Sequence, residues 1–413
     1  MTSDHSPKRP PAGSQRLARI APSATAEMFR RVAELKARGE PLIALNVGEP
    51  DFTPPPEILA ATARALEGGP YGYTQIAGLP ALREAICARS QARRGLSHTP
   101  DSVVVTAGAK HALFHLAQAL FDKGDEVVIP TPSWVSYADQ ARLAGAKPVF
   151  VPCAEADGFM PTVAALRAAI TDKTKALILC SPNNPTGSTF DEAALRELAA
   201  LLVSKSIWVI VDEIYAELYY GVGSHAPSLL SVAPELREQT VIVDGVSKSY
   251  AMTGFRVGWL IAPRELARAC ETLQSQSTSS IATIAQLATL AALSGDQSCV
   301  EKMRSAYRER RDVLVAELSK VPGVSCQVPS GAFYVFANIA GWLGRRAGSK
   351  MLASDVDVAE WLLDEAKVAL MPGSAFGGPG YVRISYAAGL NDLREAVKRI
   401  SESASKLEPN PST

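Results

Sequence analysis

A lysine stands between two apolar runs in the segment "VIVDGVSKSYAMTGFRVGW", residues 241–259. The first run is β-branched and predicts a buried strand, and a strand-like pattern resumes at residues 255–260. Small and hydroxyl residues surround Lys248, and Arg256 follows it in the same interval. An isolated lysine of this kind most often lies in a solvated loop, because charged side chains are rarely fully buried. The role of Lys248 therefore depends on which other residues meet it.

Polar side chains also follow two other predicted strands. Asn184 lies in "LCSPNNPTG", and "IVDEIY" places Asp212 and Tyr215 at the end of the next strand. Taken singly, these residues have ordinary structural explanations: a turn residue, a helix N-cap and a core side chain. Ligands in largely parallel sheets bind beyond the carboxyl ends of the strands. Together with Lys248, these residues therefore predict one ligand site.

Gly108, Ala109 and Lys110 in "TAGAKHAL" stand at the start of a predicted helix, where free N–H groups and the helix dipole favour a phosphate. A tight bend would explain Gly108 alone. The chain has neither G-x-G-x-x-G after an early strand nor G-x-x-x-x-G-K-[ST], so dinucleotide and P-loop chemistry lack their loops. His111 and His115 are spaced i, i+4 without the glutamate of H-E-x-x-H. We interpret them as a polar helix face and expect no metal site.

The elements that must position these residues alternate between helices and short apolar strands. Such alternation predicts an α/β fold, with a largely parallel sheet covered by helices on both faces. The strands are expected at residues 103–106, 126–130, 147–151, 175–180, 207–212 and 241–243, and helices at 108–121, after 133 and at 191–203.

After residue 297 the pattern changes to a second, smaller α+β unit. We expect its main elements at 299–320, 356–366, 381–386 and from 390, with an N-terminal helix at 25–38. The resulting domain prediction is a large domain over 49–300, a small domain from 16–48 together with 301–405, and Pro/Ser-rich disordered tails at 1–15 and 406–413.

Chain length and composition agree with a two-domain globular protein. A chain of 413 residues is too long to form a single compact core, so we expect two domains. The 42 Lys and Arg residues balance 42 Asp and Glu residues, so no excess of charge indicates binding to nucleic acid or to an anionic membrane. The 6 cysteines form no C-x-x-C pair. No apolar stretch reaches the ~20 residues that span a bilayer, and the first residues lack the apolar middle of a signal peptide, so we expect a cytoplasmic protein.

Ten segments carry a family resemblance: "PSAT", "NVGEPDF", "YGYTQIAGLPALREA", "TAGAKHALFHLAQ", "PSWVSY", "SPNNPTG", "DEIYAEL", "SKSYAMTGFRVGW", "PSGAFYVF" and "YVRISYA". In this order they resemble the fold-type I pyridoxal-phosphate aminotransferases of the aspartate aminotransferase family, and the resemblance runs from residue 19 to 404. It implies a type I fold with a large and a small domain, pyridoxal 5′-phosphate as cofactor, and a homodimer with shared active sites.

The resemblance gives the polar residues at the sheet edge their chemical roles. Asp212 matches the carboxylate that keeps the cofactor's ring nitrogen protonated, which makes the ring an electron sink. Lys248 matches the amine that forms the resting imine and then carries a proton between the substrate Cα and C4′ of the cofactor. Tyr215 and Asn184 match the residues that hydrogen-bond the 3′ oxygen of the ring.

The phosphate and the second subunit are also implied. Arg256, Ser247 and the N–H groups of residues 108–110 match the phosphate cradle, and Tyr73 matches a residue that reaches in from the partner. The family pattern "SxSK" has a hydroxyl three residues before the lysine, where this chain has Gly245.

Substrate contacts follow from the same resemblance. Arg383 matches the arginine whose planar fork pairs with the substrate α-carboxylate, and Gly48 matches a backbone contact to that carboxylate. Trp134 matches the aromatic residue that stacks on the ring beside the substrate, where Asn184 also lies.

The identity of the amino acid is the least determined feature. The segment "SQSTSSIATIAQ" holds no arginine for a side-chain carboxylate, and the chain resembles instead the bacterial subgroup that uses a lysine and hydroxyls. Lys110, Ser23 and Thr25 are present, but Ala21 stands where members acting on aspartate and prephenate often carry a lysine.

We therefore predict a ping-pong aminotransferase, with aspartate and 2-oxoglutarate as the leading substrate pair. A broad, aromatic or neutral amino acid specificity is the alternative. A pyridoxal-phosphate C–S lyase or decarboxylase would share the fold and the lysine, and a ligand-sensing regulator without activity is a third class.

Overall fold

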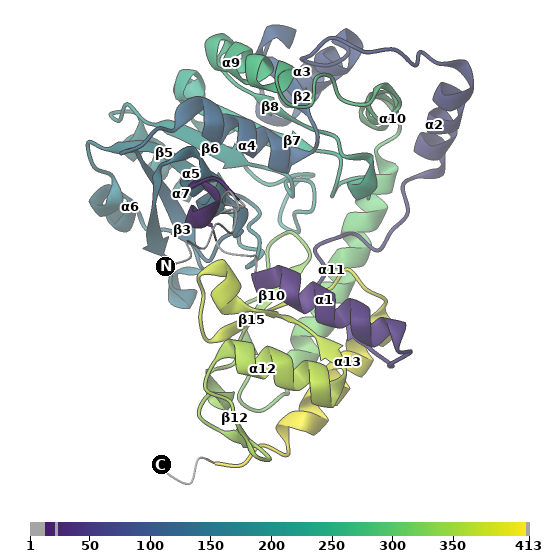
Figure 1. The fold of residues 1–413 in the computed structure, drawn as a ribbon, viewed down its shortest axis with the longest axis vertical. Coiled ribbons are helices and arrows are strands. Elements are labelled where there is room, and N and C mark those ends of the chain that lie inside the picture. Colours follow the sequence, from purple (N-terminus) through teal and green to yellow (C-terminus); the bar gives the residue numbers. More distant parts are fainter. Residues whose placement is uncertain (1–12, 21–23, 410–413) are drawn as a thin grey trace, which may run out of the picture.

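The computed structural model describes residues 13–20 and 24–409. Figure 1 shows two bodies stacked along the long axis, a larger one around a wide sheet and a smaller one that holds the last helices of the chain. Residues 1–12 and 410–413 of the expected tails lie outside the described residues, as do Ala21 and Ser23.

The large body centres on a seven-stranded sheet in the order β2-β8-β7-β6-β5-β3-β4. Neighbouring strands run parallel, except that β8 pairs antiparallel with both β2 and β7. The largely parallel sheet predicted from the sequence is confirmed. The strands are β2 (Val103–Thr106), β3 (Glu126–Thr131), β4 (Lys147–Pro152), β5 (Thr174–Cys180), β6 (Trp208–Asp212), β7 (Thr240–Gly245) and β8 (Gly258–Ile261).

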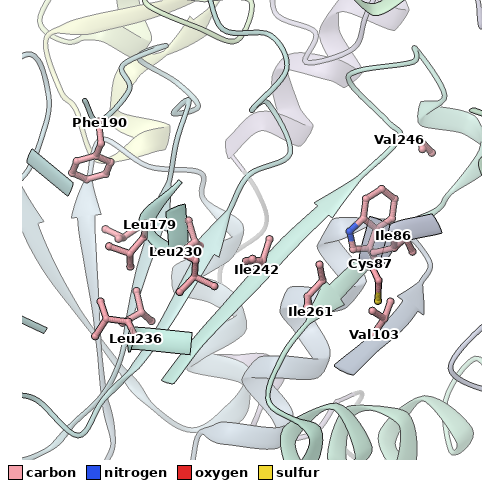
Figure 2. Close-up of a cluster of buried hydrophobic side chains, with 14 of the residues drawn as sticks. Ile86, Cys87, Val103, Leu179, Phe190, Leu230, Leu236, Ile242, Val246 and Ile261 are labelled. Carbon is pink, nitrogen blue, oxygen red and sulfur yellow. The ribbon is translucent and has the colours of Figure 1, made fainter. Parts of the chain in front are cut away.

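Side chains of each central strand alternate between two hydrophobic cores. Val103 and Val105 of β2 belong to one core, whereas Val104 belongs to the other. Figure 2 shows the first core, where Ile242 and Ile261 on the sheet lie along the same face as Val103. A strand that buries both faces must be apolar at consecutive positions, which explains the unbroken apolar runs in the sequence.

Helices cover both faces of this sheet. Helices α3, α7, α8 and α10 supply the first core, and α4, α5 and α9 supply the second. The helices of this part are α2 (Pro56–Gly68), α3 (Pro80–Arg94), α4 (Ala109–Leu120), α5 (Ser136–Ala144), α6 (Val163–Ala169), α7 (Glu192–Leu202), α8 (Leu229–Val232), α9 (Arg264–Ser275) and α10 (Thr283–Ser294).

The small body contains an antiparallel sheet in the order β14-β15-β10-β9. Its strands are β9 (Ser325–Cys326), β10 (Tyr334–Asn338), β14 (Met371–Pro372) and β15 (Tyr381–Ser385), and β1 (Ile43–Ala44) pairs separately with β13 (Val368–Ala369). A hairpin joins β11 (Arg346–Ala347) and β12 (Lys350–Met351). The helices are α1 (Ala24–Ala37), α11 (Ser298–Leu318), α12 (Asp355–Trp361) and α13 (Leu390–Ala404).

We propose that the two bodies are the two predicted domains and that α11 crosses between them. Val300, near its start, belongs to a core of the large sheet, whereas Met303 and later apolar residues of α11 belong to the core of the small body. At the N-terminal side, Met28 and Val32 of α1 pack with the small body. The short 3-10 helix Leu17–Arg19 contacts α5 of the large body, and we therefore propose that the small domain begins at α1.

Two further expectations from the sequence need correction. The predicted disordered tail does not begin at residue 406, because Leu407 is buried in the small-domain core and Glu408 forms a β-bridge with Arg346. His115 is not part of a polar helix face, because it is buried and its ring lies 4.0 Å from that of His111. Among the described residues, no helix is long and apolar enough to cross a membrane.

Candidate active site

A pocket of about 410 Å³ lies at one edge of the large sheet, against the small domain. Eleven of the residues singled out in the sequence line it: Gly48, Ala109, Lys110, Trp134, Asn184, Asp212, Tyr215, Ser247, Lys248, Arg256 and Arg383. These residues come from separate segments and meet in one pocket, as their positions near the ends of the predicted strands led us to expect.

The strand directions explain why these residues meet. The parallel strands β5, β6 and β7 end at the same edge, where the chain continues to Asn184, Asp212 and Lys248. Strand β8 runs the opposite way, so Arg256, which precedes it, lies at that edge too. The antiparallel strand thus adds a cation to the site that a parallel strand in its place would have carried to the far edge of the sheet.

Lys248 lies in the wall of the pocket with its amine held by a neutral acceptor. Its Nζ donates a hydrogen bond to the backbone oxygen of Gly48, at 2.6 Å. Burial lowers the pKa of Lys248 to about 8, against the opposing effect of Glu49, and Arg383 and Arg256 lower it further. The amine therefore releases its proton much more readily than an ordinary lysine.

Asp212 is a buried carboxylate, 3% exposed. The Tyr137 hydroxyl donates a hydrogen bond to its Oδ2 at 2.7 Å, and the backbone N–H of Ile214 donates to its Oδ1 at 3.2 Å. Burial raises the pKa of Asp212 to about 6, although both bonds act in the opposite direction. Among the ion pairs of the described residues, none includes Asp212. The carboxylate thus has neutral donors and lacks a cationic partner.

Arg383 is a buried cation that forms no ion pair with any carboxylate in the described part of the chain. Its guanidinium donates hydrogen bonds to Asn184 Oδ1 at 3.0 Å and to the backbone oxygen of Asn46 at 2.8 Å. The guanidinium carbon lies 4.5 Å from the ring centre of Tyr334 and 4.8 Å from that of Phe376. The buried Nε has no hydrogen-bond partner. Aromatic walls and neutral acceptors hold the planar fork, whose geometry suits a carboxylate.

Two tyrosines form the floor beside Arg383. The hydroxyls of Tyr215 and Tyr334 lie 2.9 Å apart. A Cβ atom added to Gly48 would lie 2.8 Å from the Tyr334 hydroxyl, so the close approach of backbone and phenol requires glycine. The chain at Gly48 therefore forms part of the pocket wall through its backbone alone.

The start of α4 and Arg256 form a second corner of the site, whose donors suit an anion. Gly108 has φ +85°, and a Cβ atom there would lie 2.5 Å from an Arg256 guanidinium nitrogen. A Cβ atom on Gly258 would lie 2.4 Å from the backbone nitrogen of Ala109, so two glycines bring β8 and the helix start together. The first N–H groups of a helix have no partner within it and attract anions.

Lys110 lies at the side of the pocket, with its Nζ 4.8 Å from the ring centre of Trp134. Burial lowers the pKa of Lys110, and the nearby Arg256 lowers it further. The Trp134 ring also packs edge-on against Tyr137, with 5.4 Å between ring centres. Lys110 and Trp134 thus form one wall in which the cation and the aromatic face are already in contact.

Two predicted residues lie elsewhere. Gly108 is not itself in the pocket lining, although a Cβ atom added there would meet Arg256. Tyr73 is 94% exposed and lies outside the lining. The fold of one chain therefore does not bring Tyr73 to the other predicted residues.

Several lining residues escaped the sequence prediction. Tyr137, Tyr334, Cys180 and Phe376 line the pocket, and the buried side chain of Asn46 has no hydrogen-bond partner. Tyr137 stands in the same segment "PSWVSY" as Trp134, but Trp134 precedes the helix α5 that holds Tyr137, so no helical spacing links the two residues. Spacing does not mark Tyr334 either, since it lies within an apolar strand.

Gly245, which stands where the family pattern has a hydroxyl, lies in a tightly packed place. A Cβ atom on Gly245 would lie 3.0 Å from the Cα atom of Gly258 and 3.0 Å from the backbone oxygen of Val257. The paired glycines allow β7 and β8 to approach closely at the site, and this spacing leaves little room for a serine.

Known proteins provide independent comparisons. Residues 40–400 match the family described as aminotransferase class I and II. The chain is 45% identical over 390 residues to the aspartate aminotransferase of Geobacillus stearothermophilus, covering 94% of this chain and 97% of that protein.

Solved structures agree with this sequence similarity. The aspartate aminotransferase of Rhizobium meliloti superposes with a TM-score of 0.93 at 39% identity, covering 96% of this chain and 99% of that one. The aspartate aminotransferase of Thermus thermophilus with maleate gives a TM-score of 0.89 at 41% identity, covering 95% and 100%.

Proposed function

The chain belongs to the class I and II aminotransferases, and we propose that it transfers the amino group of L-aspartate to 2-oxoglutarate by a ping-pong mechanism. The observation that carries the substrate proposal is the charge of the pocket. Four cationic side chains line it, Lys110, Lys248, Arg256 and Arg383, together with the carboxylates of Glu49, Asp139 and Asp212. Among the ion pairs of the described residues, none includes any of the four cationic groups. Such a pocket favours ligands with several anionic groups.

We infer that pyridoxal 5′-phosphate is the cofactor, because the residues present fit its charged groups. The unpaired buried carboxylate of Asp212 suits a protonated ring nitrogen, and Arg256 with the start of α4 suits a phosphate. Lys248 lines the same pocket with an amine that deprotonates readily. When bound, the cofactor supplies an electron sink for the bond to the substrate Cα.

We assign the proton transfer to Lys248. Its amine is held by a neutral acceptor, the Gly48 carbonyl, and its lowered pKa lets it both accept and release a proton near neutral pH. Tyr215 and Asn184 complete the set of polar groups around the proposed ring position. Ser247 is buried beside Lys248 and is proposed to assist Arg256 with the phosphate.

Arg383 is proposed to bind the substrate α-carboxylate. Its fork is fixed by Asn184 and by the Asn46 carbonyl, and the unpaired Nε leaves bonding capacity. Gly48 contributes backbone to the same corner. With Arg256 assigned to phosphate and Lys248 to proton transfer, Lys110 is the remaining cation for a side-chain carboxylate.

A second specificity is favoured by a different observation. Lys110 already contacts the Trp134 ring, and a shallow apolar groove continues from it along Phe114 and Leu143. A side chain without charge would find apolar contacts there and would leave Lys110 on Trp134. Neutral or aromatic amino acids are therefore the alternative donors.

We propose a homodimer in which Tyr73 serves the partner's site. Tyr73 is almost fully exposed in a single chain and lies outside its pocket. A cytoplasmic location is proposed as well, since all 6 cysteines are free thiols in the described residues.

The half-reaction with a panel of amino acids tests the proposed function. Protein loaded with pyridoxal phosphate is mixed with aspartate, glutamate, phenylalanine, tyrosine and alanine, and the cofactor spectrum is followed. We expect aspartate to yield oxo acid and pyridoxamine phosphate in equal amounts and faster than the neutral donors. A fastest reaction with phenylalanine would establish the alternative, and no pyridoxamine phosphate from any donor would refute both.

A further inference from the structure

The Tyr137 hydroxyl donates a hydrogen bond to the buried carboxylate of Asp212. The bond to Asp212 Oδ2 is 2.7 Å long, shorter than the 3.2 Å bond from the Ile214 amide to Oδ1. Both side chains are 3% exposed, so water does not compete for this bond. A buried hydrogen bond from a hydroxyl to a carboxylate is among the stronger kinds in proteins.

The groups around Asp212 make this bond necessary. On the neighbouring strand β5, Cys180 is its register partner, and burial raises the pKa of that thiol so that it stays neutral. The carboxylates of Asp244 on β7 and of Glu213 oppose ionisation of Asp212. They are paired with Arg93 and Arg94, respectively.

Lys248 is a cationic group that interacts with Asp212 from the pocket side. Asp212 raises the pKa of Lys248, but the Lys248 amine donates to the Gly48 carbonyl and forms no ion pair with the carboxylate. Apart from the Ile214 amide, Tyr137 is therefore the donor that stabilises the ionised carboxylate within the described residues.

We propose that Tyr137 is a positioning residue, which keeps Asp212 ionised and aimed at the cofactor's ring nitrogen while its ring supports Trp134. Two contacts carry this inference: the hydrogen bond to Asp212 and the edge-on packing against Trp134. The two contacts can be tested separately, because Tyr137→Phe removes the hydroxyl that bonds Asp212 and keeps the ring that packs against Trp134. The inference rests on the proposed function, since it assumes that Asp212 faces the ring nitrogen.

Binding of pyridoxamine phosphate to the cofactor-free protein tests the inference without turnover. This ligand cannot form an imine with Lys248, so its affinity reports the polar contacts alone. The reference ligand is the analogue with CH in place of the ring nitrogen, which has the same phosphate. The ratio of the two dissociation constants, measured across pH 4.5–9, isolates the pair formed by the ring nitrogen and Asp212.

In the wild type, the preference for pyridoxamine phosphate should fall as the pH drops through about 6, because the pKa of Asp212 is raised to about 6 by burial. In Tyr137→Phe the same fall should occur about one to two pH units higher, the shift expected when a hydrogen bond to a charged group is lost. Tyr137→Met, which also lacks the hydroxyl, repeats the test should the phenylalanine variant not fold.

Tyr307→Phe is the matched control. Tyr307 is a buried tyrosine whose hydroxyl lies 3.3 Å from the Asp51 carboxylate, away from the pocket lining. This variant should leave the pH dependence at its wild-type position. A fall at the wild-type pH in Tyr137→Phe would overturn the proposal. Equal affinity of the wild type for both ligands at every pH would instead refute the role of Asp212 in the proposed function.

Discussion

The Nζ atom of Lys248 lies 2.6 Å from the carbonyl oxygen of Gly48. Lys248 follows β7 of the large sheet, whereas Gly48 follows β1, which pairs with β13 of the small body. The bond therefore joins the two bodies across the pocket. Because the acceptor is neutral, burial of the amine is not offset by a carboxylate in contact, and the pKa of Lys248 falls to about 8.

Chemical modification should reveal this lowered pKa. In the cofactor-free protein, the rate of reductive methylation at Lys248 should rise with a midpoint near pH 8, since only the neutral amine reacts. Ordinary lysines titrate near about 10.4, so the bulk of the lysines should react at higher pH. Peptide mapping at each pH gives both profiles from one sample. A Lys248 profile that coincides with the bulk would contradict the described environment.

The phosphate corner should depend on the absence of a side chain at Gly108. Gly108→Ala places a methyl group 2.5 Å from the Arg256 guanidinium, which must move away. We expect cofactor affinity to fall about ten- to a hundredfold, which corresponds to a strain of about 1–3 kcal/mol. Gly124→Ala is the control, because Gly124 also has positive φ but has nothing within 4 Å of its added Cβ. Equal cofactor affinities in the two variants would argue against phosphate binding by Arg256 and the start of α4.

Mixing two defective variants should restore activity if Tyr73 acts in the partner's site. Tyr73→Ala impairs both sites of its own dimer, and Lys248→Ala abolishes both sites of its own. In a mixed dimer, one site combines an intact Lys248 with an intact Tyr73. Random reassembly of equal amounts should therefore yield about a quarter of the wild-type activity, since half the dimers are mixed and each has one complete site. No gain over the separate variants would place Tyr73 outside the partner's site.

The sequence predicted which edge of the sheet carries the proposed active site, because the polar residues stand at the ends of predicted parallel strands. Asp212 is the last residue of its strand, Asn184 and Lys248 follow theirs within four residues, and parallel strands end at one edge. Strand β8 shows the limit of this reasoning. A four-residue apolar strand has the same pattern in either direction, and its antiparallel pairing was visible only in the structure.

Residues that act through contacts across the fold were harder to predict. Tyr334 lies inside a buried strand, and its hydroxyl contacts Tyr215 from a segment more than a hundred residues away. The Pro/Ser-rich composition around Leu407 predicts a disordered tail. Leu407 is nevertheless buried, because it packs into the small-domain core, which its neighbours in sequence do not reveal. Contacts between side chains far apart in sequence leave no periodic pattern, so periodicity cannot predict them.

A buried ion pair beside the site should matter for stability. Arg94 pairs with Glu213, the residue after Asp212, and the two side chains are 2% and 5% exposed. Arg94→Met leaves an uncompensated buried carboxylate and should destabilise the protein by about 3–5 kcal/mol. Arg94→Met/Glu213→Met should recover most of that loss, measured as the thermal unfolding midpoint. Arg196→Met, which breaks an exposed pair with Glu192, is the control and should change little.

Lys110 decides between the two proposed specificities. It is the fourth cation of the pocket, and its Nζ lies 4.8 Å from the Trp134 ring centre. Lys110→Met keeps an unbranched stem against Trp134 and removes the charge. If Lys110 binds a side-chain carboxylate, kcat/KM for aspartate and glutamate should fall about ten- to a hundredfold more than for phenylalanine, the worth of a charge-assisted hydrogen bond.

The ratio of the two substrates separates this role from a general one. Lys110 also supplies a backbone N–H at the start of α4, which the substitution leaves in place, so loss of the phosphate contact is not expected. Disturbance of Trp134 would lower the rates with aspartate and phenylalanine together, because both would use the same ring position. Equal losses for the two donors would therefore reject the dicarboxylate assignment, and the apolar groove along Phe114 and Leu143 would then identify the preferred donors as neutral or aromatic amino acids.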